Sequence, residues 1–190
     1  MESTTLSPPE TLPERERYTY SDVQQLPEGT LCQLIDGSLI MSPAPTPYHQ
    51  RILRHLFREL DAHASNQGEV LFAPVDVKLS ETDVLQPDLV FVAEARADII
   101  GEQAISGAPD LVVEVLSPST AYHDVTTKKR LYEVHGVHEY WIVDPASETV
   151  EVYTSAGQGF TQHIRQVETG TATSALLEGF TLDLDALFLK

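Results

Sequence analysis

Basic residues are scarce in this chain, which limits what its surface can bind. The 190 residues include 12 lysines and arginines against 29 aspartates and glutamates, a net charge of -17. Nucleic-acid-binding proteins usually carry a basic surface, so this charge argues against tight nonspecific binding of DNA. A locally positive or metal-loaded cleft remains compatible with it.

Cysteines and long apolar runs are scarce as well. Cys32 is the single cysteine, which excludes an internal disulfide framework and a cysteine-cluster metal site. No apolar run approaches the roughly 18 residues that a membrane span requires, and residues 1–5 lack the basic and apolar regions of a signal peptide. We therefore expect a cytoplasmic protein with no membrane partner.

Apolar residues are present in the proportion that a globular core needs. They make up 42% of the sequence, and the length suits one domain. Three prolines and several charges interrupt the start of the chain. The sequence therefore predicts a flexible tail over residues 1–17, followed by a single domain over residues 18–190.

The order of the expected elements is typical of an α/β (α+β) fold, with a mixed β-sheet flanked by helices. Asp36-Gly37 between two apolar runs is a β-hairpin signal, and apolar periodicity predicts helices over residues 48–64 and 120–135. Strands are expected in the hairpin and at residues 70–79, 86–92, 108–117, 137–144, 148–154 and 160–167, with a last strand and a short helix within 174–189.

Two of the expected strands are short apolar runs, and each carries one acid where burial makes a charge costly. Asp88 opens the first run, and Glu114 lies within the second, with Val112 and Leu116 two residues to either side. Side chains two residues apart share a face of a strand, so Glu114 lies on an apolar face, where an unpaired carboxylate is costly. Two acids on neighbouring strands favour a shared divalent cation, because hard cations prefer oxygen ligands.

Both acids also have an ordinary structural interpretation. An aspartate after a proline, here Pro87-Asp88, is frequent as a turn residue at the start of a strand. Glu114 can instead pair with a buried lysine or arginine.

The first expected helix has a clear apolar stripe, formed by Ile52, Leu53, Leu56, Phe57 and Leu60. His49 projects into that stripe. It is either a site residue or a hydrogen-bonded core histidine. Glu59 falls at its edge, where a solvated position is the alternative to a metal ligand. The opposite face carries three arginines, Arg51, Arg54 and Arg58. They are candidate contacts to a DNA backbone, and the alternative is that they pair with neighbouring acids.

The second expected helix places a lysine among core-facing side chains. Its inward stripe is Ala121, Val125, Leu131 and Tyr132, with Lys128 at the centre and Lys129 and Arg130 at the flanks. Asp124, Lys128 and Tyr132 follow at four-residue intervals. The alternative to a site role is an ordinary surface ion pair between Asp124 and Lys128. An inward Lys128 shortly after the Glu114 strand predicts one site with two acids and one cation.

These residues resemble a known family of nucleases. Pro87-Asp88, Glu114-Val115-Leu116 and an inward Lys128 resemble a variant of the PD-(D/E)XK superfamily in which the lysine stands on the following helix. The chain also resembles, from about residue 18 to 188, the Uma-two family of bacterial restriction-endonuclease-like proteins. The segments that carry this resemblance are residues 34–37, 47–49, 84–92, 107–120 and 136–145.

The resemblance implies a restriction-endonuclease-like core with added β-hairpins and a metal-dependent hydrolysis of DNA. Mg²⁺ or Mn²⁺ would bind Asp88, Glu114 and the backbone carbonyl of Val115. Lys128 would orient a water molecule or offset charge on the phosphorus in the transition state. DNA is the expected partner, and a homodimer is left open. The residues expected to line the cleft or support the site are His49, Tyr132, Asp124 and Glu59.

The chain departs from the family pattern in its hairpin, where Gln33 and Ser38 replace two frequent glutamates. Together with the acidic net charge, this leaves two alternatives to a DNA endonuclease. One is a nuclease fold that serves as a binding or assembly module, and the other is a hydrolase of a smaller phosphoester.

Overall fold

A six-stranded mixed β-sheet forms the centre of the molecule. The computed structural model describes residues 14–117, 124–155, 157, 159–167 and 169–189, so the expected tail falls largely outside the described residues. The sheet has the order β11-β10-β9-β8-β6-β3. Among the described residues of this sheet, β8 and β9 pair in parallel and the other neighbouring strands are antiparallel. The strands are β3 (Gly68–Phe72), β6 (Leu89–Ala93), β8 (Leu111–Val115), β9 (Glu139–Asp144), β10 (Thr149–Ser155) and β11 (Phe160–Val167).

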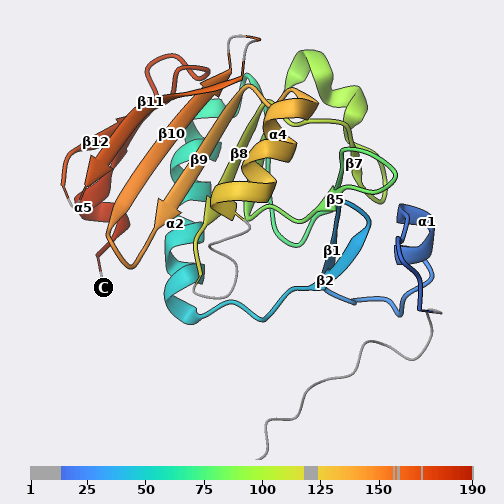
Figure 1. Ribbon diagram of the computed structural model, residues 1–190. Helices are drawn as coiled ribbons and strands as arrows, with labels where there is room; N and C mark the ends of the chain where they lie inside the picture. Colours follow the sequence, from blue (N-terminus) through green and yellow to red (C-terminus); the bar gives the residue numbers. More distant parts are fainter. Residues whose placement is uncertain (1–13, 118–123, 156, 158, 168, 190) are drawn as a thin grey trace, which may run out of the picture.

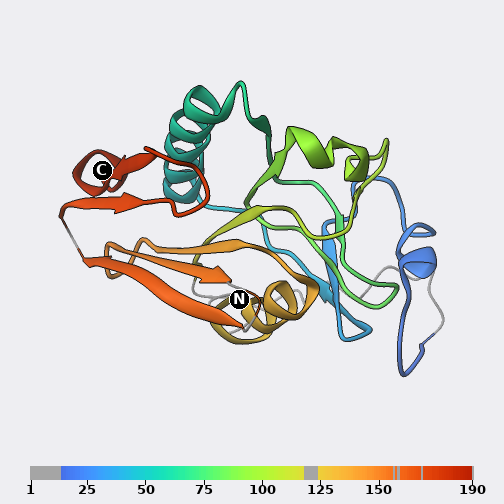
Figure 2. The same cartoon turned by 90° about the horizontal axis from the view of Figure 1, so that it is seen from above.

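One helix covers each face of this sheet (Figures 1 and 2). Helix α2 (Pro47–Ala64) packs on one face, and α4 (Lys129–His135), preceded by a π-helical turn η2 (Asp124–Lys128), packs on the other. Every residue of β8 is buried. Leu111, Val113 and Val115 join the core under α2, whereas Val112 joins the core under α4. The expected mixed sheet flanked by helices is therefore confirmed.

Short strands extend the structure beyond this layer. A five-stranded sheet has the order β2-β1-β5-β4-β7, and a two-stranded sheet pairs β12 with β13. The expected hairpin is present, and both Asp36 and Gly37 adopt positive φ angles, as a two-residue turn of this kind requires. The bounds are β1 (Cys32–Ile35), β2 (Ser38–Met41), β4 (Val77–Lys78), β5 (Val84–Leu85), β7 (Ile105–Ser106), β12 (Thr171–Thr173) and β13 (Thr181–Asp183).

The start of α2 is determined locally. Thr46 caps the helix by accepting a hydrogen bond from the backbone N–H of His49, and Pro47 occupies the first turn, where its missing N–H is not needed. Ile52, Leu53, Leu56 and Leu60 are buried as the apolar stripe predicts. The final short helix, α5 (Leu184–Leu187), lies beside α2 in Figure 2.

Two expectations about the elements are wrong. The strand predicted over residues 70–79 is divided into β3 and β4, which belong to different sheets, because Pro74 between them has no N–H to donate to a strand ladder. Val125, expected to face inward, is 41% exposed. It lies in the π-helical turn, whose wider spacing changes the phase that an α-helical wheel assumes. Residues 120–123 of that helix, including Ala121, lie outside the described residues.

Five short helical or strand elements had no counterpart among the expectations: α1 (Tyr20–Val23), β5, η1 (a 3₁₀-helix, Glu94–Ile99), β7 and β12. Within the part of the chain that the structure describes, no helix combines the length and the apolar character needed to cross a membrane.

Candidate active site

Asp88 lies just before β6, and Glu114 lies near the end of β8. Strands β6 and β8 are antiparallel, and Leu89 pairs with Val113. Continuing that register by one residue puts Asp88 across from Glu114, and cross-strand neighbours of this kind lie about 5 Å apart. The prediction that both acids come from neighbouring strands is therefore consistent with the pairing.

Asp88 is held by the backbone of β8. Its Oδ2 accepts a hydrogen bond from the Val115 N–H at 2.7 Å and lies 3.3 Å from His49 Nε2. The Asp88 side chain is 18% exposed, so it stays open to solvent while its orientation is fixed. The hydrogen bond from the Val115 amide was not anticipated from the sequence, because it depends on how two strands align.

Glu114 forms a buried cluster with α4 and the turn before it. Its Oε1 accepts a hydrogen bond from Lys128 Nζ at 3.0 Å and another from the Tyr132 hydroxyl at 2.7 Å. The side chains of Glu114 and Lys128 are only 3% and 4% exposed. The alternative in which Glu114 pairs with a buried lysine thus describes this contact correctly, and the predicted inward position of Lys128 is confirmed.

A buried ion pair of this kind is a costly arrangement. Removing two charges from water consumes most or all of their mutual attraction, and an apolar pair of the same volume often stabilises a fold as well or better. The pair is therefore weak evidence for a role in stability alone. A functional role for Lys128 and Glu114 is consistent with that energetic cost.

His49 approaches the same place from α2. Its Nε2 lies 3.1 Å from the carbonyl oxygen of Val115. A carbonyl only accepts, so Nε2 donates in this contact. Val115 thus donates through its N–H to Asp88 and accepts through its carbonyl from His49, which joins the first turn of α2 to the end of β8.

The oxygen atoms at this site suit a hard cation. Magnesium commonly uses one or two carboxylates and retains several water molecules, and the site offers Asp88, Glu114 and the Val115 carbonyl. No group of three or more histidine, cysteine, aspartate or glutamate side chains arranged to hold a metal occurs among the described residues. Two carboxylates and one carbonyl are too few for a cage built from protein ligands alone, so an ion held here would keep several water ligands.

The other predicted site residues separate into four groups. Tyr132 is buried and contacts Glu114. Glu59 is exposed on α2, and among the described residues it has no contact with the site. The side chain of Asp124 lies outside the described residues. Arg51, Arg54 and Arg58 are exposed on the outer face of α2, as the helical wheel predicts.

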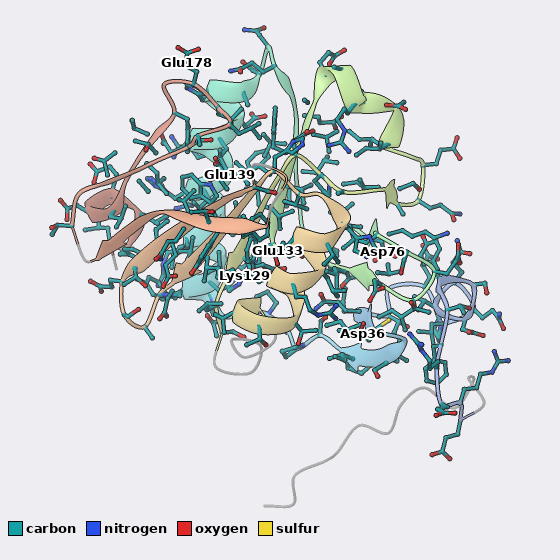
Figure 3. The ribbon with its side chains drawn as sticks, turned by 45° about the horizontal axis from the view of Figure 1, so that its top comes forward. Asp36, Asp76, Lys129, Glu133, Glu139 and Glu178 are labelled. Atoms are coloured by element: carbon teal, nitrogen blue, oxygen red, sulfur yellow. The ribbon has the colours of Figure 1, made fainter. Side chains whose placement is uncertain are left out.

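Next to Lys128, Lys129 occupies a different environment. Its Nζ lies 3.4 Å from the centre of the Tyr153 ring, and Figure 3 shows it on α4 near Glu133. Partial burial lowers the pKa of Lys129, while the charges of Glu151 and Glu133 act in the opposite direction. Lys129 therefore points away from the Glu114 cluster, as expected.

The substituted hairpin position, Gln33, lies beside the site. Its Oε1 accepts a hydrogen bond from the backbone N–H of Gln86, and its Nε2 donates to the Ser42 hydroxyl. Gln33 is buried, and Gln86 precedes Asp88 by two residues. Gln33 thus holds the backbone that leads to Asp88 through a neutral amide.

Comparisons with known proteins identify the family and the fold. A family model described as "Uma2: Putative restriction endonuclease" matches residues 19–185. A solved structure from Anabaena variabilis, titled as a "putative nuclease belonging to DUF820", aligns with a TM-score of 0.73 over 90% of this chain and 97% of that chain. The identity is 20%, so this likeness shows the fold. The uncharacterized protein sll1609 of Synechocystis is 27% identical over 128 residues, which is 66% of this chain and 72% of that protein.

Proposed function

Because the chain belongs to the Uma2 (Uma-two) family, we propose that it is a metal-dependent endonuclease of the PD-(D/E)XK type that hydrolyses DNA phosphodiester bonds. The observation that carries the proposal is the buried contact of Lys128 with Glu114 beside the more exposed Asp88. It brings two carboxylates and one cation to the same end of two paired strands. Mg²⁺ or Mn²⁺ is the proposed cofactor.

Asp88, Glu114 and the Val115 carbonyl are the residues that would hold the ion. When bound, such an ion polarises a phosphate and lowers the pKa of a water molecule. The chain itself supplies orientation. The Val115 amide fixes Asp88, the Tyr132 hydroxyl fixes Glu114, and His49 fixes the direction of the Val115 carbonyl.

Lys128 supplies the positive charge of the proposed mechanism. An ammonium group held in a buried position stabilises the negative charge that develops on the phosphate oxygens, since little reorganisation is then needed during the reaction. Its contact with Glu114 keeps the group in place before substrate binds. Lys128 can alternatively orient the attacking water through the same ammonium group.

The direct test is cleavage of supercoiled plasmid and of single-stranded DNA in Mg²⁺ or Mn²⁺, with EDTA as the blank. We expect cleavage by the wild-type protein and by Lys129→Met, and none by Glu114→Gln or Lys128→Met. A model phosphodiester, bis(p-nitrophenyl) phosphate, is tested in parallel. Hydrolysis of that compound without DNA cleavage would favour the hydrolase of smaller phosphoesters. DNA binding without hydrolysis of either substrate would favour the binding module.

A further inference from the structure

The outer face of α2 and the C-terminal helix α5 enclose a small basic groove. Its volume is about 180 Å³, and its lining includes Arg51, Arg54, His55, Arg58, Leu187 and Leu189. The Tyr48 hydroxyl in the first turn of α2 donates a hydrogen bond to the Phe188 carbonyl at 3.1 Å. This contact joins the two walls, which lie side by side in Figure 2. Among the residues that the structure describes, those that line the groove include no aspartate or glutamate.

The arginines of this groove differ from five other basic residues of the molecule. Carboxylates pair with Arg15, Lys78, Arg96, Lys128 and Arg130. The guanidinium groups of Arg51, Arg54 and Arg58 make no ion pair or hydrogen bond with any residue that the structure describes, although Arg51 stacks over the Tyr48 ring at 5.6 Å. In a chain with 29 acids and 12 basic residues, three adjacent arginines without an acid form a locally positive surface. The alternative that they pair with neighbouring acids is thus wrong for the described residues.

The spacing of these arginines suits an extended polyanion. Seven residues separate Arg51 from Arg58, and a helix rises about 1.5 Å per residue, so the row is about 10 Å long. Phosphates of one DNA strand advance about 3.4 Å along the helix axis per nucleotide. The row therefore covers about three phosphates. Guanidinium groups match phosphate oxygens in geometry and remain charged at every physiological pH.

We propose that the groove between α2 and α5 binds the sugar-phosphate backbone of DNA, with Arg51, Arg54 and Arg58 contacting successive phosphates. A row of three arginines along the helix favours an extended polyanion over a single free phosphate, because guanidinium groups match phosphate oxygens one by one. DNA is the polyanion that the proposed function supplies. This assignment rests on the proposed function, and it concerns binding only, so it is tested without metal.

The test is fluorescence anisotropy of a labelled DNA duplex in EDTA, over a range of salt concentrations. The variant is Arg51→Gln/Arg54→Gln/Arg58→Gln in the full chain. A matched control, Arg15→Gln/Lys78→Gln/Arg130→Gln, removes the same number of charges from other surfaces. We expect the groove variant to bind at least tenfold more weakly and to lose about 0.9 in the slope of log K against log salt for each lost phosphate contact. The control variant is expected to change affinity less than threefold.

Equal losses in the two variants, or an unchanged salt slope in the groove variant, would overturn the proposal. Displacement of DNA by polyglutamate at matched charge concentration would also overturn it, in favour of an acidic protein partner. Unfolding curves of both variants show whether either has lost its fold, and single Arg→Gln variants replace the triple variant if it has. A chain that binds DNA through the arginines but does not cut it refutes the proposed function and leaves the groove intact. Normal cutting by the groove variant supports the proposed function and refutes the assignment of the groove.

Discussion

Two glutamates lie buried on the two parallel strands at the centre of the sheet, and they are held in opposite ways. Glu114 on β8 accepts from the ammonium of Lys128 and the hydroxyl of Tyr132. Glu139 on β9 accepts from the Trp141 indole, the Ser174 hydroxyl and the amides of Ala175 and Leu176. Glu139 lies within the sheet region in Figure 3, and it is only 1% exposed.

The difference teaches how to separate a structural acid from a functional one. The four donors around Glu139 are neutral, and three of them belong to residues 174–176, so the carboxylate anchors the C-terminal loop to the sheet. Glu114 is instead paired with a charged group, the ammonium of Lys128, next to the partly exposed Asp88. Neutral donors replace water around a carboxylate, whereas a cation beside an acid also provides a charge that chemistry can use.

The largest expected effect is that of Lys128→Met, because it leaves the Glu114 carboxylate buried without its cation. Breaking a buried ion pair by removing one partner costs about 3–5 kcal/mol of unfolding free energy. Any DNA hydrolysis should also fall by about a hundredfold or more. Urea denaturation measures the first effect, and plasmid cleavage the second.

The double variant Lys128→Met/Glu114→Gln sharpens this result. It removes both charges, so we expect it to recover most of the lost stability while remaining inactive. Lys129→Met is the matched control, with a stability change below about 1 kcal/mol, since its ammonium lies on a partly exposed ring. A loss of activity in Lys129→Met instead of Lys128→Met would show that the roles of the two lysines are reversed.

Glu139→Ala should be the next largest change. It leaves buried donors of Trp141 and the 174–176 loop without their acceptor, which we expect to lower the unfolding free energy by about 3 kcal/mol. Glu178→Ala, on the exposed part of the same C-terminal segment, is the control and should change it by less than about 0.5 kcal/mol. Once corrected for the unfolded fraction, cleavage by Glu139→Ala should match the wild type. A specific loss of turnover would contradict the structural assignment.

Metal binding gives a third way to separate the two glutamates. Mn²⁺ at 100 times its dissociation constant should add about 2.7 kcal/mol to the stability of the wild-type protein, because the ion binds only the native site. The same increment is expected in Glu139→Ala, and none in Glu114→Ala. Thermal melting over a Mn²⁺ titration measures it. Equal responses in both variants would place the metal elsewhere.

The smallest expected effect is that of Tyr132→Phe. It removes one hydrogen bond to Glu114 and leaves the Lys128 contact, so we expect a loss of about 1–2 kcal/mol in stability and a reduced but measurable rate. A parallel melting and cleavage series compares it with Lys128→Met. Tyr132→Phe behaving like Lys128→Met would mean that the hydroxyl, and not the cation, is the group on which the site depends.

Local patterns made much of the site predictable. The alternation of side chains along a strand placed Glu114 on an apolar face, and the helical wheel placed Lys128 inward and the three arginines outward. The same wheel failed at Val125, where a π-helical turn replaces the α-helix. It also offered Glu59 as a candidate, although that side chain faces solvent.

The sequence by itself therefore determined the hairpin turn at Asp36-Gly37, the apolar stripe of α2 and the two acid-bearing strands. Each of these depends on residues within a few positions of one another, where backbone preference and side-chain periodicity act directly. Only the tertiary structure decided the contact of His49 with Val115, the donors to Glu139 from residues 174–176, and the closing of the arginine groove by α5. These partners are separated by many residues along the chain, and strand register and helix packing, which bring them together, are set by the burial of the whole core.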